Sequence, residues 1–250
     1  MKVGYYIVSK GRPKRQHTAA LLHASKLPFK IFVEPQDYEA YCSEFGKRKI
    51  VNIKENDGGI HWVRNFVKEY SKSRGEDYHW HLDDDIRHVY ICVKGKNMET
   101  TARTVFGRIQ KIVAQYQNVA LAGLAASAFN RYEKHPVVPN RFVYSCMLVK
   151  NDQFLWRAET EDDLDYNLQV LTAGQCTMAF KVFSFAFSPQ NTISGGLTEI
   201  RTPQRREQWV YQILRDWSYL GLKMKRKKDG TPRVVTSGIW RKFNHKPQWI

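Results

Sequence analysis

Three consecutive aspartates, Asp83, Asp84 and Asp85, follow directly after the apolar run YHWHL at residues 78–82. Adjacent carboxylates repel one another and raise each other's pKa unless a cation neutralises them. A hard divalent ion such as Mg²⁺ or Mn²⁺ binds carboxylate oxygens and keeps coordination positions open for substrate phosphates. A solvated acidic turn or the start of a helix explains the same residues, because both tolerate negative charge. The run therefore predicts either a divalent-cation site or an acidic turn.

A second acidic cluster, RAETEDDLDYNL, includes Glu161, Asp162 and Asp163 and opens a predicted helix at 161–172. Helix starts favour Asp and Glu whatever the function, because the helix dipole is positive there. The functional alternative is a general base that deprotonates an attacking hydroxyl group. Both interpretations of the second cluster stay open on the residues alone.

Alternating strands and helices precede the first aspartate run. Apolar patterns predict strands at 3–8, 29–33, 49–53 and 78–82, and helices at 16–25, 35–45 and 60–72. This alternation is typical of an α/β fold with a mostly parallel sheet, in which ligands bind beyond the carboxyl ends of the strands. We therefore expect the segment from Ser9 to Arg12 and the segment from Asp83 to Asp85 to lie on one rim of the sheet.

The second half of the chain has a more mixed pattern. It predicts helices at 100–116, 161–172 and 205–220, and strands at 119–125, 142–149 and 177–187. The lysine-rich stretch LKMKRKKDGTPR at 222–233 is expected to be a mobile loop. The loop at 188–199, which contains Gly195 and Gly196, is interpreted either as a lid over a ligand or as an ordinary surface loop.

Composition narrows the class of protein. No run of eighteen apolar residues exists, and the amino-terminal residues lack the apolar stretch of a signal peptide. Four scattered cysteines without a CxxC pair indicate thiols in a reducing cytoplasm. The formal net charge is +16, and residues 201–250 contribute +10 of it, with thirteen Lys and Arg against three Asp and Glu. Such a segment attracts phosphate backbones or an anionic surface.

The motifs SKGRP, FVEPQDYEAY, GGIHWVRN, HLDDDI and ETEDDLDYNLQVLTAG occur in this order between residue 3 and about residue 198. Together they resemble the TET-associated glycosyltransferases of phages and metagenomes, which act on hydroxymethylcytosine in DNA. The resemblance implies a GT-A-like (Rossmann-like), mostly parallel central sheet flanked by helices, with a basic C-terminal extension. It also implies a UDP-sugar donor, a divalent cation (Mn²⁺ or Mg²⁺), and a phage protein working in the host bacterial cytoplasm.

The same resemblance implies roles for individual residues. HLDDDI looks like the DxD motif, which places the metal on Asp83 and Asp85. Glu161, Asp162 and Asp163 resemble the motif that supplies the catalytic base, and Asp162 matches its position best. The residues expected to contact the nucleotide or its phosphates are Ser9, Lys10, Arg12, Arg64, Asp83 and Asp84. His79 and His81 should share one face of their strand, and no histidine matches a third metal ligand.

We expect residues 1–200 to form the nucleotide-sugar-binding and catalytic domain, with 201–250 as a DNA-contacting part of the same domain. The candidate DNA-binding residues are Lys225, Arg226, Lys227, Lys228, Arg233, Arg241 and Lys242. Trp209 and Trp217 are expected to pack within a helix. The partners are thus DNA and a UDP-sugar, with no membrane and no obligate protein partner. The alternatives are a protein, lipid or polysaccharide acceptor, a metal-dependent nuclease, and a non-catalytic nucleic-acid-binding module.

Overall fold

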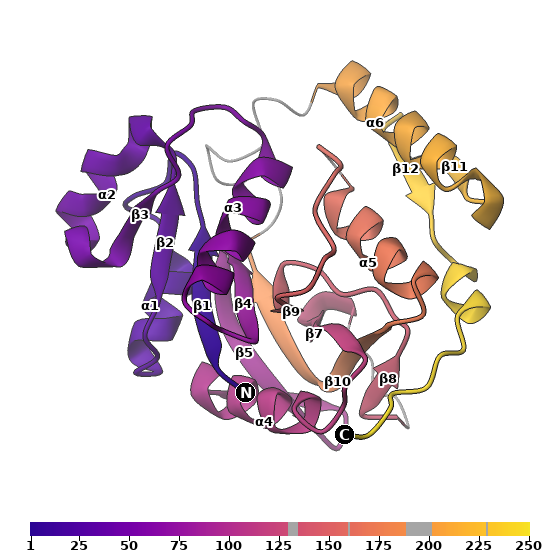
Figure 1. Cartoon of the computed structure of the whole chain (residues 1–250), viewed down its shortest axis with the longest axis horizontal. Coiled ribbons are helices and arrows are strands. Elements are labelled where there is room, and N and C mark those ends of the chain that lie inside the picture. The colour runs from indigo at the N-terminus through magenta and orange to yellow at the C-terminus, as the bar shows by residue number, and fades with distance from the viewer. Residues whose placement is uncertain (130–134, 160, 189–201, 229) are drawn as a thin grey trace.

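The computed structural model describes residues 1–129, 135–159, 161–188, 202–228 and 230–250. Within these residues a ten-stranded sheet forms the centre of the molecule, with the order β3-β2-β1-β4-β9-β7-β10-β5-β6 and β8 beside β10 (Figure 1). Its strands are β1 (Val3–Val8), β2 (Lys30–Val33), β3 (Ile50–Asn52), β4 (Tyr78–Asp83), β5 (Ile86–Val93), β6 (Lys96–Thr100), β7 (Val119–Ala126), β8 (Val137–Pro139), β9 (Cys146–Lys150) and β10 (Cys176–Phe187).

Seven of the ten strands run in one direction, and β5, β8 and β9 run in the other. The first four strands are parallel in the order β3-β2-β1-β4, which is the arrangement of one half of a doubly wound nucleotide-binding sheet. The predicted α/β fold class, a mostly parallel central sheet flanked by helices, is confirmed.

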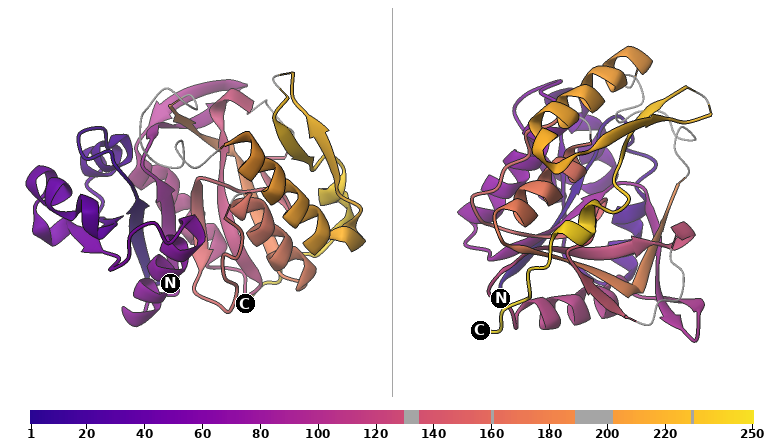
Figure 2. Two further views of the ribbon diagram at one scale, coloured as in Figure 1. Left: turned by 90° about the horizontal axis from the view of Figure 1, so that it is seen from above. Right: turned by 90° about the vertical axis from the view of Figure 1, so that its right-hand side faces the viewer.

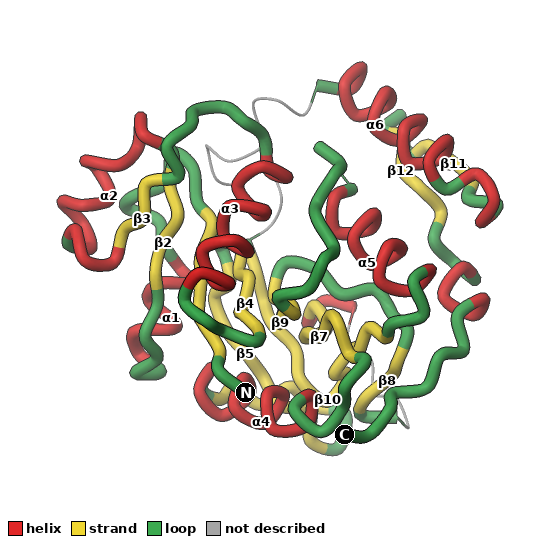
Figure 3. Tube along the Cα trace, in the orientation of Figure 1, coloured by secondary structure: helices red, strands yellow, loops and turns green. Residues whose placement is uncertain are grey.

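Helices cover both faces of the sheet (Figures 1 and 3). The α-helices are α1 (His17–Ala24), α2 (Tyr38–Phe45), α3 (Ile60–Ser73), α4 (Ala102–Val113), α5 (Asp162–Thr172) and α6 (Pro203–Asp216). α1 and α4 pack on one face, where Trp80 of β4 stacks on Phe106 of α4 with ring centroids 3.9 Å apart. α3 and α5 pack on the other face, so each face of β4 is buried.

Local sequence explains several element boundaries. Gly59 precedes α3 with φ +84°, a conformation that glycine adopts readily and other residues do not. The side chains of Thr101 and Thr202 cap α4 and α6 by accepting a backbone N–H three residues later. β5 and β6 form a hairpin through Lys94 and Gly95, both at positive φ, as the tight two-residue hairpin turns require. The sequence patterns did not predict this hairpin.

The predicted strand at 142–149 is too long at its start, because β9 begins only at Cys146. Asn167 of α5 accepts from the backbone N–H of Val143 at 3.0 Å and donates to its carbonyl at 2.8 Å. Val143 is therefore paired with a side chain instead of a neighbouring strand. The predicted helix at 205–220 similarly ends at Asp216 and continues as the 3-10 turn Ser218–Leu220.

The prediction of a mobile loop at 222–233 is wrong. β11 (Lys223–Arg226) and β12 (Pro232–Val235) form an antiparallel hairpin, which we call the basic ribbon. Met224 and Val234 turn inward onto an apolar cluster with α6, and this buried side stabilises the ribbon despite its lysine-rich composition. Figure 2 shows α6 lying between α5 and the ribbon. The 3-10 turn Ile239–Lys242 follows the ribbon.

Candidate active site

The carboxyl ends of β1 and β4 lie side by side, with Val8 paired to Asp83 in a parallel register. Ser9 Oγ donates to Asp84 Oδ2, and Arg12 Nη1 donates to Asp84 Oδ1 at 2.9 Å. The expectation that these two segments share one rim of the sheet is confirmed. Asp84 is only 5% exposed, so its carboxylate fixes the loop after β1 to the end of β4.

Strand alternation separates the three aspartates. Asp83 points to the face covered by α3 and α5, where Arg64 Nη2 lies 3.7 Å from its Oδ1. Asp84 points toward α1 and the loop after β1. Asp85 lies in the turn before β5, and burial, followed by the charges of Asp83 and Asp84, raises its pKa to about 7. The run thus presents Asp83 and Asp85 as the two carboxylates not used to hold the loop.

Arg64 on α3 joins the two acidic clusters of the sequence. It is 4% exposed, with Nε 2.8 Å from Asp162 Oδ2 and Nη1 3.2 Å from Asp163 Oδ1, in addition to its contact with Asp83. Burial alone would lower the pKa of Arg64, but Asp162, Asp163 and Asp83 raise it overall, so the side chain stays charged. We call the five aspartates of the two clusters, Asp83, Asp84, Asp85, Asp162 and Asp163, together with Arg64, the acidic rim.

Asp162 and Asp163 form the first turn of α5, and Glu161 precedes them in the left-handed conformation, φ 51°. The positive end of the helix dipole favours their ionised forms. Burial nevertheless raises the pKa of Asp163 well above its ordinary range, with Arg64 opposing this and Asp162 adding to it. The side chain of Asp163 is 17% exposed and that of Asp162 is 11% exposed, so Asp163 is the more accessible of the two.

Lys10, a predicted phosphate contact, lies between two acidic partners from other loops. Its Nζ is 2.9 Å from Glu34 Oε2 at the end of β2, and it also pairs with Asp57 in the segment before α3. Burial lowers the pKa of Lys10, but the hydrogen bonds to Asp57 and Glu34 raise it overall. Lys10 therefore links the loops that follow three neighbouring strands.

A family model described as TET-Associated Glycosyltransferase matches residues 3–195, more than three quarters of the 250-residue chain. The chain belongs to the TET-associated glycosyltransferase family. This membership makes it a glycosyltransferase and leaves the nuclease and the non-catalytic binding module without support. No curated protein matches the chain at a significant level.

Several solved structures are similar to this glycosyltransferase at low identity. A197 from STIV has a TM-score of 0.46 and 11% identity, and the match covers 76% of this chain and 87% of A197. A putative nucleotide-diphospho-sugar transferase from Desulfovibrio desulfuricans G20 has a TM-score of 0.44 and 10% identity, with 72% and 80% covered. GalNAc-T7 with UDP, GalNAc and Mn²⁺ has a TM-score of 0.42 and 10% identity, with 88% and 57% covered. Likeness at this level gives no information about individual site residues.

Two histidines of the glycosyltransferase, on the strand that ends at the aspartate run, are packed side chains. His79 and His81 share one face of β4, as expected, with ring centroids 5.7 Å apart. His79 Nδ1 is 2.9 Å from Asn151 Oδ1, and burial lowers the pKa of His79 to about 3. Burial, followed by the charge of Arg64, lowers the pKa of His81 well below its ordinary value. Among the described residues, no group of three or more His, Cys, Asp or Glu is arranged to hold a metal ion.

Several residues that position the rim were missed in the sequence. Thr18 of α1 donates from Oγ1 to the Asp83 carbonyl at 2.5 Å and accepts from the Ile86 N–H at 3.0 Å, which fixes the backbone of the aspartate run. Asn65 of α3 donates to the Trp156 carbonyl at 2.8 Å and accepts from the Trp156 N–H at 2.9 Å. Only the position of Asn65 beside Arg64 in the GGIHWVRN motif signalled a role for it.

Lys68, one helical turn after Arg64, is 0% exposed. Its Nζ donates to Asp152 Oδ1 at 2.6 Å, to the Phe154 carbonyl at 2.6 Å and to Tyr166 Oη at 2.8 Å. It thereby ties α3 to the segment 152–157 and to α5. A lysine inside an amphipathic helix pattern gives no sequence signal of such burial.

The predicted DNA-binding residues lie on the ribbon and the turn after it, and all seven are exposed. Arg226 pairs with Glu207 of α6, and Lys242 Nζ donates to the Leu220 carbonyl at 2.7 Å. Trp217 is buried and donates to Asp165 Oδ1 at 2.9 Å, as its predicted packing requires, and Trp209 is half-buried. Apart from Ser188, the predicted lid at 188–199 lies outside the described residues.

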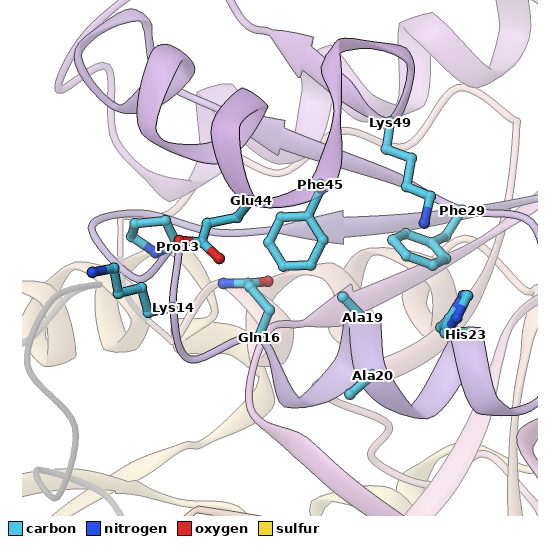
Figure 4. Close-up of a pocket in the computed structure, with 10 residues that line it drawn as sticks. All are labelled: Pro13, Lys14, Gln16, Ala19, Ala20, His23, Phe29, Glu44, Phe45 and Lys49. Carbon is cyan, nitrogen blue, oxygen red and sulfur yellow. The ribbon is translucent and has the colours of Figure 1, made fainter.

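A separate groove of about 270 Å³ lies between α1 and α2 (Figure 4). It is lined by Pro13, Lys14, Gln16, Ala19, Ala20, His23, Phe29, Glu44, Phe45 and Lys49. None of the acidic rim residues lines it, so it is not part of the candidate active site. No described helix has the length and apolarity needed to cross a membrane.

Proposed function

We propose that this glycosyltransferase moves a sugar from a UDP-sugar to the hydroxyl group of hydroxymethylcytosine in DNA, with the help of a divalent cation. The observation that carries the proposal is the convergence of two acidic motifs, far apart in sequence, around Arg64. One motif lies where a parallel sheet binds ligands, and the other opens the helix beside it. Membership of the family supports the reaction class.

Asp83 and Asp85 would hold the cation. Mg²⁺ and Mn²⁺ at phosphate sites use one or two carboxylates together with substrate phosphates, which agrees with a pair of acids rather than a complete protein ligand set. Burial and then the charges of Asp83 and Asp84 raise the pKa of Asp85 to about 7, and an added cation would offset both effects. The bound cation would neutralise the charge of the departing diphosphate.

The basic residues of the rim divide into two kinds. Arg12 holds Asp84 and Lys10 holds Glu34, so both fix loops at the edge where the nucleotide would bind. We propose that they, together with Ser9, also contact the nucleotide or its phosphates. Arg64 is surrounded by carboxylates and more than nine-tenths buried, so we assign it to holding Asp83, Asp162 and Asp163 in place instead of to phosphate binding.

Asp162 or Asp163 would remove the proton from the acceptor hydroxyl as oxygen attacks the sugar carbon. The motif favours Asp162, whereas greater exposure and a raised pKa favour Asp163. Changing each residue to Asn separately decides between them, because the base variant loses turnover while its donor affinity survives. Equal, wild-type turnover in both variants would remove this pair from the mechanism.

The deciding experiment incubates the protein with Mn²⁺, a panel of UDP-sugars and DNA that contains hydroxymethylcytosine, followed by mass spectrometry of the nucleosides. A hexose-sized mass gain on the modified nucleoside is the expected result. Metal-dependent hydrolysis of one UDP-sugar without a mass gain would keep the donor and point to another acceptor. If no donor gave either hydrolysis or a mass gain, the proposal would be overturned.

A further inference from the structure

Three of the four charged residues in the strands of the basic ribbon lie on one side, and the fourth, Arg226, lies on the other. Lys223, Lys225 and Arg233 are exposed. On the other face, Val234 belongs to a buried apolar cluster and Met224 packs against it. This separation follows from strand alternation, which turns successive side chains to opposite faces. The composition of the segment shows only its charge, and the fold places Lys223, Lys225 and Arg233 on one face of a two-stranded ribbon.

The ribbon is anchored to the helix that opens with Asp162 and Asp163. Its Val234 shares a cluster with Val210 and Ile213 of α6 and with Leu164 and Leu168 of α5. The indole N–H of Trp217, directly after α6, donates to Asp165 Oδ1 of α5 at 2.9 Å. Whatever binds the ribbon is therefore held at a fixed position relative to the start of α5.

Within the ribbon, Lys225 lies directly opposite Arg233. Like charges at opposed positions of an antiparallel pair destabilise it. Arg226, on the neighbouring position, is paired with Glu207 of α6, which leaves the outward Lys225 and Arg233 facing solvent. A row of phosphates would relieve this repulsion and release condensed counterions at the same time.

We propose that the basic ribbon docks in the major groove of double-stranded DNA, where Lys223, Lys225 and Arg233 contact phosphates. This inference rests on the proposed function for the identity of the acceptor. The major groove of B-DNA admits a two-stranded ribbon, and substituents on C5 of a pyrimidine point into this groove. The ribbon would then bind on the side of the duplex that carries the acceptor hydroxyl.

The composition of the ribbon favours a duplex over a single strand. Proteins that bind single strands stack bases on aromatic side chains. The strands KMKR and PRVV contain no aromatic residue. The exposed tyrosines of the region, Tyr211 and Tyr219, lie on α6 and on the turn after it. The ribbon itself thus offers charge without a stacking surface.

The test compares a ribbon variant with a control of equal charge change. In the ribbon variant, Lys223, Lys225 and Arg233 are all changed to Gln. In the control, the exposed Lys47, Arg48 and Lys111, which lie near α2 and on α4, are changed to Gln. Binding of a fluorescein-labelled duplex containing hydroxymethylcytosine, and of the matching single strand, is followed by anisotropy over a range of KCl concentrations.

We expect the ribbon variant to bind the duplex at least about ten-fold more weakly, with the slope of log K against log salt reduced by about 3. The control should stay within about two-fold of the wild type, because its charges act only at long range. Circular dichroism melting curves that match the wild type exclude unfolding as the cause.

Equal losses in both variants would overturn the inference, because they would show a general effect of net charge. If the wild type bound the single strand more tightly than the duplex, and the ribbon variant lost this binding, the partner of the ribbon would be single-stranded nucleic acid instead of a duplex. Failure of the proposed function is distinguishable, since nucleoside mass spectrometry measures transfer independently. If the duplex binds through the ribbon but no transfer occurs, the inference holds without the proposed function. If the ribbon changes affect neither transfer nor duplex binding, only the proposed function holds.

Discussion

Arg64 is 4% exposed and contacts three carboxylates of the acidic rim, whereas Lys225 and Arg233 of the basic ribbon face each other in the open. Both regions gather charges of one sign. In the rim the buried charge of Arg64 lies 2.8 Å, 3.2 Å and 3.7 Å from the carboxylates that it holds. In the ribbon, solvent screens the charges and the strands only set their spacing. Single substitutions should therefore have large effects in the rim and small, additive ones on the ribbon.

The largest effect is expected for Arg64→Met. Asp83, Asp162 and Asp163 would lose their shared counter-charge, and removing one partner of a buried ion pair costs about 3–5 kcal/mol. Urea unfolding should show this loss in the free energy of unfolding at pH 7. Arg74→Met is the matched control, because its side chain is 57% exposed and 3.9 Å from Glu76, so its loss should stay below about 1 kcal/mol. Similar losses in both variants would break the comparison.

Lys68 is a second buried cation, one helical turn after Arg64. Lys68→Met removes three hydrogen bonds and leaves Asp152 without its cation, and we expect a loss of about 2–3 kcal/mol in unfolding free energy. Asp152→Asn keeps an acceptor for the Phe154 N–H but removes the charge. The double variant should lose less than the sum of the two single losses, because neither charge is then left alone. Strict additivity in chemical denaturation would contradict a coupled pair.

A substitution of Asp85 should stabilise the protein at high pH, whereas those of Arg64 and Lys68 should destabilise it. Its pKa is raised to about 7, so the stability from its protonated form is present below pH 4 and is lost as the pH rises through 7. Asp85→Asn stays neutral at every pH. In EDTA at pH 8 this variant should be more stable than the wild type by about 1–2 kcal/mol, a value reduced for solvent screening. The advantage should disappear near pH 4.

Thermal unfolding at both pH values, with and without Mn²⁺ and UDP, measures this prediction. Under the proposed function the ligands should raise the melting temperature of the wild type and leave that of Asp85→Asn unchanged. A variant less stable than the wild type at pH 8 without ligands would show that Asp85 has a stabilising partner instead of a repulsive environment.

The sequence predicted the elements around the acidic rim well, because the signals there are local. The patterns at 3–8, 60–72 and 161–172 match β1, α3 and α5 closely, and the strand-end rule correctly placed Ser9 and Arg12 beside the aspartate run. What it could not predict are the tertiary contacts. Nothing in the spacing of Arg64 shows that it lies between Asp83 and Asp162, which are 79 positions apart.

For the basic ribbon, the local sequence pattern itself was misleading. Its lysines suggested a mobile loop, because charge and a turn-forming DGTP stretch dominate the local pattern. The apolar residues that decide the outcome, Met224 and Val234, are few and separated by the turn. Their partner surface on α6 and α5 is visible only in the folded chain. Assignments of the individual rim and ribbon residues to metal, nucleotide, catalysis and DNA remain predictions for the experiments above.

The smallest effect is expected on the ribbon. Lys225→Gln removes one member of the opposed Lys225–Arg233 pair, so the free energy of unfolding should rise by about 0.2–1 kcal/mol at low salt. Lys223→Gln is the control in the same ribbon, because Lys223 lies opposite the uncharged Val235. The two variants should converge in 1 M salt, where screening removes the repulsion. If Lys225→Gln destabilised the chain by as much as Arg64→Met, the ribbon charge would be structural, and an open basic face could not explain its presence.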